Sequence, residues 1–227
     1  LINILGADHI GYIKRITAAT NALSDGKTSL ICRVCQLVKL YKGGQPYKMS
    51  KRAGDFISVR EFLNEVDKDS VRFMMLNRSN DVELDFDFDK VLEKTRENPV
   101  FYVQYSYARI SSLFAAANID TKKDFEIDEN NFALNNHELN LFRKILDWPK
   151  VVETASVKFE PHRVPFYLYE LATLFHSYWS KGNENPNYKF IVNGKIKSNS
   201  TLAIIKLVAL TIENGMNILD VSLPTKM

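Results

Sequence analysis

The sequence is poor in cysteine and nearly neutral. Its 227 residues include two cysteines, too few for the disulfide framework of a small secreted domain. The formal net charge is +3, and neither half of the chain is a basic tail of the kind that binds nucleic acid. Any nucleic-acid partner would therefore have to be held by a local patch.

Long hydrophobic runs are also missing. No stretch free of Lys, Arg, Asp and Glu approaches the roughly 20 residues that a membrane-spanning helix needs. No basic and then apolar leader opens the sequence, and we find neither an internal repeat nor a low-complexity tract. We therefore expect a cytoplasmic protein that does not insert into a membrane. With 45% hydrophobic and 25% charged residues, the composition is that of an ordinary globular chain.

The first 45 residues predict part of an α/β domain. A buried strand is expected at residues 1–6, a helix at 11–23 and a second strand at 30–40. A parallel sheet needs several such β–α–β units, with helices covering both of its faces. Because one unit leaves the sheet open, we interpret this segment as the tail of a larger α/β domain.

Most of the remaining sequence predicts helices. Short helical segments are expected at residues 59–66 and 69–78, and the Asn98-Pro99 pair marks a break. Residues 85–89 alternate, but the pattern after them is helical. Longer helices are expected at residues 100–117, 136–157, 161–180 and 198–219. The predicted fold class is mainly α, in which a residual Rossmann-like α/β piece precedes an α-helical bundle.

Two connecting segments carry charge of one sign. Residues 119–135 hold five acidic residues and two lysines, which predicts a surface loop. Residues 181–197 hold four lysines and one glutamate, and they form the basic patch of the sequence. This patch is either a solvated loop or a binding surface.

The strongest chemical motif is Lys48-Met49-Ser50-Lys51-Arg52-Ala53-Gly54, which follows a strand and a Gly-Gly turn. It places three cations within five positions. Fixed cations stabilise the charge that develops on a polyphosphate during reaction, and lysine suits a loop that closes and reopens. The alternative is a solvent-exposed basic turn.

These residues resemble a known family. Lys48-Met49-Ser50-Lys51 is similar to the second signature of class I aminoacyl-tRNA synthetases, and Arg52-Ala53-Gly54-Asp55-Phe56 resembles the arginyl-tRNA synthetases in particular. The resemblance covers nearly the whole chain in the family's order. The further matching runs are residues 6–12, 69–73, 84–87, 98–105, 108–110, 214–219 and 224–227.

The resemblance implies the joining of arginine to its tRNA through an arginyl-adenylate, with ATP as substrate and Mg²⁺ accompanying the ATP. In this family Lys48 and Lys51 would be catalytic and contact the ATP phosphates. Gly6 and Asp8 would hold the ribose, although Asp8 could instead cap a helix. The full set of implied ATP-binding residues is Gly6, Asp8, His9, Lys48, Met49, Ser50 and Lys51.

The run His9-Ile10-Gly11-Tyr12 looks like the first class I signature but cannot be that element. Gly11 and Met49 are 38 positions apart, which leaves no room for the intervening sheet of the catalytic fold. The resemblance therefore implies the C-terminal part of such an enzyme. We expect this part to be inactive by itself.

In the helical half the resemblance implies recognition of the tRNA anticodon. Unstacked bases are commonly bound on aromatic faces. The residues at the family's contact positions are Tyr102, Tyr105, Trp179 and Met227. Trp179 stands where the family pattern has tyrosine, and residues 210–213 lack a basic residue that the last helix often carries. Aromatic residues at helical spacing are also common in protein cores, so both interpretations stay open.

The implied division has three parts. Residues 1–60 would be the end of the catalytic domain with the signature loop, residues 61–97 a helical stem, and residues 98–227 the anticodon-binding domain. The implied partners are arginine tRNA, ATP and arginine, with a monomeric chain.

The sequence predicts no protein-bound metal, because the pair Cys32-x-x-Cys35 lacks the further ligands of a zinc site. Two alternative functions remain. One is a non-catalytic RNA-binding or scaffold protein built on the same bundle. The other is a different class I enzyme such as a cysteinyl-tRNA synthetase.

Overall fold

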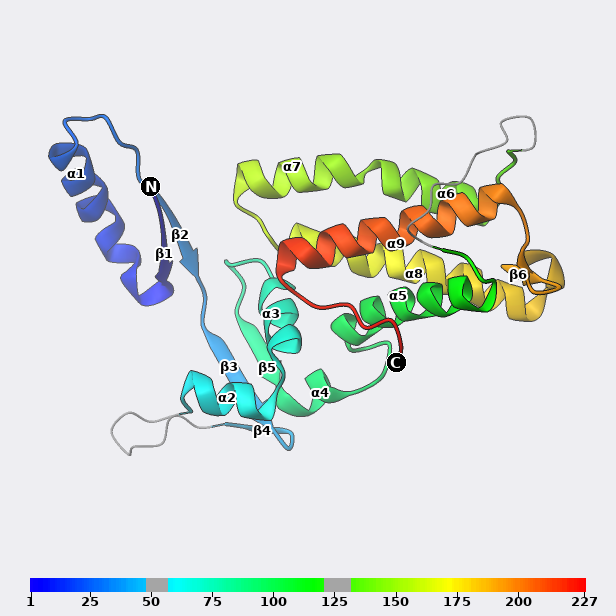
Figure 1. Cartoon of the computed structure of the whole chain (residues 1–227). Helices are drawn as coiled ribbons and strands as arrows, with labels where there is room; N and C mark the ends of the chain where they lie inside the picture. Colours follow the sequence, from blue (N-terminus) through cyan, green and yellow to red (C-terminus); the bar gives the residue numbers. More distant parts are fainter. Residues whose placement is uncertain (48–56, 121–131) are drawn as a thin grey trace. The chain divides into compact units, whose positions relative to one another are not determined.

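The computed structural model describes residues 1–47, 57–120 and 132–227 (Figure 1). Contacts group these residues into two compact units. Unit 1 comprises Leu1–Glu65 and Arg78–Val91, and unit 2 comprises Val66–Asn77 and Leu92–Met227. The predicted fold class, mainly α with a residual α/β piece, is confirmed. The proposed division at residues 60/61 and 97/98 stays a prediction.

The first part of unit 1 is a β–α–β arrangement. Strand β1 (Ile2–Gly6) leads through the 3₁₀ helix η1 (Ala7–Tyr12) into α1 (Ile13–Leu23), and β2 (Ile31–Cys35) pairs with β1 in parallel. The prediction that the first strand is buried is wrong. Ile2 is 57% exposed and Ile4 is 70% exposed, because one helix and one neighbouring strand cannot cover both faces of β1.

The second predicted strand, at residues 30–40, is in fact two strands that belong to different sheets. After β2 the chain passes Gln36, whose backbone N–H donates to the carbonyl of Asn80 at 2.8 Å. It then forms β3 (Val38–Lys42), the central strand of a three-stranded sheet. Apolar residues continue from β2 into β3 without a glycine or proline between them, so the sequence does not reveal this break.

Strand β3 has one antiparallel and one parallel neighbour. It pairs with β4 (Gln45–Pro46) through a turn in which Gly43 and Gly44 have φ of +60° and +70°, a conformation that glycine adopts freely. On its other edge it pairs in parallel with β5 (Leu84–Asp87). The first three residues of the alternating run 85–89 therefore do belong to a strand, whereas residues 88 and 89 begin the helix that the sequence favoured.

A small aromatic core supports this sheet. Helix α2 (Val59–Glu65) contributes Phe62, and the start of α4 (Phe88–Leu92) contributes Phe88. Their rings and that of Phe86 lie with centroids 5.0–5.6 Å apart, in the tilted and edge-to-face geometries that aromatic pairs prefer.

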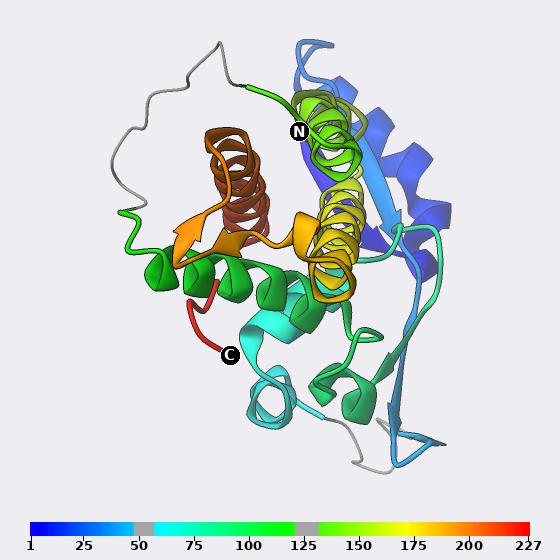
Figure 2. The ribbon, with the colours of Figure 1, turned by 90° about the vertical axis from the view of Figure 1, so that its right-hand side faces the viewer.

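Unit 2 is a helical bundle with one small hairpin. Figure 2 shows α8 and α9 nearly end-on, with α5 crossing beneath them. The bounds of its elements are α3 (Lys68–Leu76), α5 (Pro99–Ala116), α6 (Asn136–Leu146), α7 (Trp148–Lys158), α8 (Arg163–Glu184), η3 (Pro186–Tyr188), β6 (Ile191–Val192), β7 (Lys195–Ile196) and α9 (Asn199–Leu219).

The prediction of a single helix over residues 136–157 is wrong. The chain ends α6 at Leu146 and begins α7 at Trp148, with Asp147 between them. Pro149 lies in the first turn of α7, where its missing N–H costs nothing, whereas inside a continuous helix it would remove a hydrogen bond. The apolar periodicity continues across this break and hides it.

The core of unit 2 lies between α8 and α9. Leu168, Leu171 and Phe175 of α8 and Val208 and Ile212 of α9 are fully buried. These helices approach closely at Gly215, where an added Cβ would lie 2.6 Å from Cδ2 of Leu168. Glycine at this position therefore sets how near the two helices can pack.

Helix α9 is the one described helix whose length and apolar character would suit a membrane span, with a mean hydropathy of 1.5 over its most apolar window. Half of that window is buried inside the bundle. The central helix of a protein core has the same composition, so this single helix is weak evidence for a membrane.

A buried carboxylate ties three helices of the bundle together. Glu138, 2% exposed, accepts hydrogen bonds from the Tyr178 hydroxyl at 3.0 Å and the Thr201 hydroxyl at 2.5 Å. It also accepts the backbone N–H of Asn135 at 2.9 Å, which completes a capping box at the start of α6. Both buried carboxyl oxygens of Glu138 therefore have hydrogen-bond donors, as buried polar groups require.

Candidate nucleic-acid interface

Three of the residues predicted to contact RNA lie in one cluster on unit 2. Tyr102 and Tyr105 lie one turn apart on α5, and Trp179 lies on the neighbouring helix α8. The buried ring of His176 lies 4.4 Å from that of Tyr102 and 5.7 Å from that of Tyr105, measured between centroids. We call Tyr102, Tyr105, Arg109, His176 and Trp179 the aromatic cluster.

Arg109 joins the two sides of this cluster. Its guanidinium carbon lies 4.2 Å from the ring centroid of Tyr105 and 4.9 Å from that of Trp179. Its Nη2 donates to the Tyr105 hydroxyl at 2.9 Å. A planar cation this close to two aromatic rings is stabilised by cation–π attraction, and it holds both rings in place.

His176 is the neutral member of the cluster. Burial lowers the pKa of His176 to about 4, and the nearby positive charges of Arg109 and Arg96 act in the same direction. Arginine only donates, so Nδ1 of His176 accepts from Nη1 of Arg109 at 3.1 Å, and Nε2–H donates to the Tyr102 carbonyl at 3.2 Å. At neutral pH this tautomer satisfies both nitrogens of the ring.

The aromatic side chains of the cluster lie between core and solvent. Tyr102 packs on Tyr169 at 5.3 Å between centroids, and partial burial raises the pKa of its hydroxyl. Tyr105 stacks on Phe101 at 5.6 Å. Tyr102, Tyr105 and Trp179 are each partly exposed, so each can pack against the bundle and still offer part of its ring to a ligand.

Met227, the fourth predicted RNA contact, belongs to a different place on the bundle. Its side chain is 53% exposed, at the end of the tail that follows α9. The tail is held to α5 where Gln104 donates to the Ser222 carbonyl at 3.0 Å. Thr225 and Lys226 line a cavity of about 570 Å³ between α5 and α9, together with Tyr107. Tyr107 and Tyr105 lie about 200° apart around the helix axis, so this cavity and the aromatic cluster occupy different sides of α5.

Arg109 is the residue that sequence reasoning did not single out as a contact. The available signal was its spacing from Tyr105, since residues four apart are neighbours on one face of a helix. Its contact with Trp179, 70 positions further along the chain, could not be read from spacing.

The predicted nucleotide-binding residues of unit 1 lie at the end of β1. Gly6 is the last residue of the strand, and Asp8 and His9 follow within η1. An added Cβ at position 6 would lie 2.6 Å from Oδ1 of Asp8, so glycine leaves the space that this carboxylate occupies. Oδ2 of Asp8 lies 3.5 Å from Nε2 of His9, and both side chains are exposed.

The alternative role of Asp8 as a helix cap is wrong. The residue that precedes η1 is Gly6, and the residue that precedes α1 is Tyr12, neither with a side-chain capping bond. The other predicted nucleotide contacts, Lys48, Met49, Ser50 and Lys51, lie outside the described residues.

Among the residues that the structure describes, no group of three or more His, Cys, Asp or Glu side chains could hold a metal ion. Cys32 and Cys35 are both free thiols. They lie on β2, Cys32 half-buried and Cys35 exposed.

Comparison with known proteins gives matches along the entire chain. An arginine–tRNA ligase of Pelagibacter ubique is 54% identical over 227 residues, and one of Ruegeria pomeroyi is 50% identical over 228. These alignments cover 100% and 98% of this chain but 39% of each relative. The chain is thus similar to the C-terminal part of arginine–tRNA ligases, as the sequence motifs predicted.

Solved structures give the same result. A crystal structure from Campylobacter jejuni, described as an arginyl-tRNA synthetase, is 34% identical with a TM-score of 0.85 and covers 100% of this chain and 47% of that one. The arginyl-tRNA synthetase of Thermus thermophilus, 20% identical with a TM-score of 0.70, shares the fold over 100% of this chain and 41% of its own. The family model described as the DALR anticodon binding domain matches residues 103–227, which contain most of α5 and all of α6 to α9. The chain therefore belongs to the DALR anticodon-binding domain family.

Proposed function

We propose that this chain is the C-terminal portion of an arginine–tRNA ligase and that its helical bundle binds the anticodon of arginine tRNA. Support comes from the family match and from relatives that share about half of their residues with the entire chain. The chain spans 39% of those relatives, so the ligation reaction with ATP and arginine belongs to the complete enzyme. By itself the chain binds RNA and does not form arginyl-adenylate.

The observation that carries this proposal is the position of Arg109 between Tyr105 and Trp179. Single-stranded RNA is bound where bases stack on aromatic rings and on guanidinium planes. The cluster offers the partly exposed rings of Tyr102, Tyr105 and Trp179, and the contacts of Arg109 fix two of these rings before RNA arrives. A preformed site avoids the entropy cost of ordering side chains on binding.

Met227 adds a second contact to this proposal. Its exposed thioether lies at the end of a tail that is fastened to α5 through Gln104 and Ser222. A polarisable methionine packs well against aromatic rings, nucleobases included. Bases of one loop would then meet Tyr105 and Trp179 on one side of α5 and Met227 on another.

Unit 1 would serve the catalytic half of the enzyme. The exposed Asp8 carboxylate can accept hydrogen bonds from ribose hydroxyls, with Gly6 leaving room for it and His9 beside it. Lys48 and Lys51 would contact the ATP phosphates, with Mg²⁺ bound to the ATP. The exposed Ile2 and Ile4 of β1 would be covered by helices of the rest of the catalytic domain in a monomeric, cytoplasmic enzyme.

The proposal is tested by measuring the affinity of this chain for arginine tRNA and for the same tRNA with its central anticodon base replaced. Measurements at two salt concentrations separate base recognition from phosphate contacts, since phosphate contacts weaken equally for both RNAs as salt rises. Weaker binding of the altered tRNA at both salt concentrations supports anticodon recognition. Equal binding of the two RNAs, or none, would contradict it and favour a scaffold role.

A further inference from the structure

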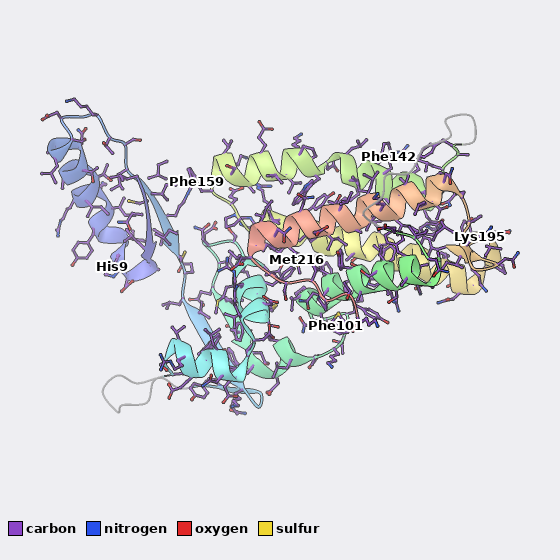
Figure 3. All side chains as sticks on the ribbon, viewed as in Figure 1. His9, Phe101, Phe142, Phe159, Lys195 and Met216 are labelled. Carbon is purple, nitrogen blue, oxygen red and sulfur yellow. The ribbon has the colours of Figure 1, made fainter. Side chains whose placement is uncertain are left out.

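The connection between α8 and α9 carries positive charge and no negative charge. Residues 185–197, which we call the basic hairpin, contain three lysines and no aspartate or glutamate. The lysines are Lys189, Lys195 and Lys197, and all three are exposed. Figure 3 labels Lys195 at the tip of this hairpin, at the far end of α8.

The basic hairpin has a defined backbone. Ile191 pairs with Ile196 and Val192 with Lys195 in an antiparallel ladder. Asn193 and Gly194 close it with φ of +51° and +73°, the signature of a tight two-residue turn. The half-buried Ile191 and Ile196 fix which face of the ladder turns inward, so Lys195 is held on the outward face.

The hairpin packs directly on the aromatic cluster. Phe190, just before β6, is buried, and its ring lies 5.7 Å from that of Trp179 and 4.5 Å from that of Tyr178. Gly182 makes this approach possible, since an added Cβ there would lie 3.0 Å from the Tyr188 carbonyl oxygen. Trp179 is therefore in contact with Arg109 and with the base of the hairpin.

The positive charge of the hairpin is largely unneutralised within the described part of the chain. Lys181, at the end of α8, is paired with Glu184 at 2.7 Å. Lys197 donates to the Asn187 carbonyl, a neutral group. None of the ion pairs among the described residues involves Lys189 or Lys195.

We propose that the basic hairpin binds the phosphate backbone of the RNA whose bases stack on the aromatic cluster. This inference rests on the proposed function. Base-stacking surfaces next to exposed positive charge are the combination found in sites for single-stranded nucleic acid, and the hairpin that carries the lysines contacts Trp179 through Phe190. Lysines act as movable point charges, and phosphates carry the same charge whatever the base sequence. Lysines therefore suit contacts to the RNA backbone. The hairpin therefore adds affinity for any RNA, and the aromatic cluster distinguishes one anticodon from another.

The test uses the double variant Lys189→Gln, Lys195→Gln in the 227-residue chain. Affinities for arginine tRNA and for the tRNA with the altered anticodon are measured across a range of salt concentrations. We expect the variant to bind both RNAs more weakly than the wild type, by the same factor. The slope of log affinity against log salt concentration should become shallower by about 2, one for each lysine. Lys189→Arg, Lys195→Arg should restore affinity and slope.

A matched control removes two charges from another surface of the same unit. Lys150 and Lys158 are exposed lysines of α7, and Lys150→Gln, Lys158→Gln changes the net charge equally. This control should keep the wild-type slope. Thermal unfolding of each variant checks that the fold is retained.

Several outcomes would overturn the inference, and they differ from failure of the proposed function. If the wild-type chain distinguishes the two tRNAs but the hairpin variant keeps its salt slope, anticodon recognition stands and the hairpin role is wrong. If the hairpin variant loses binding to anionic phospholipid vesicles and not to RNA, its partner is a membrane. If the wild-type chain binds neither tRNA, both proposals fall.

Discussion

The β1–α1–β2 segment of unit 1 and the α8–α9 pair of unit 2 differ sharply in burial. No residue of β1, η1, α1 or β2 is buried, whereas α8 contributes ten buried residues and α9 contributes eleven. Both regions have regular secondary structure. The local sequence pattern therefore determines helices and strands in both regions. Only α8 and α9, however, bury their apolar residues against other helices of the same unit.

The comparison is tested most strongly by truncating one apolar side chain in each region. Leu171→Ala in α8 should lower the free energy of unfolding of the bundle by about 2–5 kcal/mol, because it empties a fully buried site. Ile4→Ala in β1 should change it by less than about 0.5 kcal/mol, since that side chain is mostly exposed. Urea unfolding followed by circular dichroism measures both. An equal loss for the two variants would break the comparison.

A second test uses acid. The pKa of folded His176, about 4, is below its unfolded value near 6.5, so the unfolded chain binds more protons between these values. Stability from neutral His176 is present above pH 6.5 and is lost as pH falls towards 4, by up to about 3 kcal/mol. His176→Gln should flatten this part of the pH profile of the unfolding free energy, while His9→Gln in unit 1 serves as the control. A profile unchanged in the His176 variant would show that the buried ring does not govern acid sensitivity.

Two glycines sharpen the comparison further. Gly215→Ala brings a Cβ within 2.6 Å of buried Leu168 and should cost about 1–3 kcal/mol. Gly11→Ala in unit 1 meets nothing within 4 Å and should be close to neutral. The melting temperatures of the two variants give the result. A neutral Gly215 variant would mean that α8 and α9 can separate without loss.

The last expected effect, of similar size, concerns RNA binding and leaves the fold intact. Trp179→Ala should weaken the binding of arginine tRNA by roughly 1–3 kcal/mol, the value of one stacked base. Asp8→Asn should leave that affinity unchanged, because Asp8 belongs to the proposed nucleotide site of unit 1. Fluorescence anisotropy with labelled tRNA measures both, and circular dichroism checks the fold. A melted Trp179 variant would identify that residue as a core residue.

Periodicity located the helices of the chain well and its strands poorly. Helices at residues 100–117 and 198–219 are found within a residue or two, because each has an apolar face that packs into the core. The strand at 30–40 and the helix at 136–157 each turned out to be two elements, since the apolar pattern runs across both breaks. The parallel pairing of β5 with β3 joins segments far apart in sequence, which a local pattern does not record.

The candidate site, too, was predicted only in part from the sequence. Tyr102, Tyr105 and Trp179 were predicted through a family resemblance, and the structure brings them together. The role of Arg109 emerges only in three dimensions, because it depends on how α5 crosses α8. Met227 was predicted with the same three residues, but it is held on another side of α5.

The contact of Arg109 with the Trp179 ring gives the molecule a built-in optical reporter. The chain has two tryptophans, Trp148 in α7 and Trp179 in the aromatic cluster. Trp148→Phe would leave a single indole, which contacts the guanidinium of Arg109 and the ring of Phe190 and is still partly exposed. A base that stacks on this indole would quench its emission, so occupancy of the cluster could be followed in real time without any attached dye.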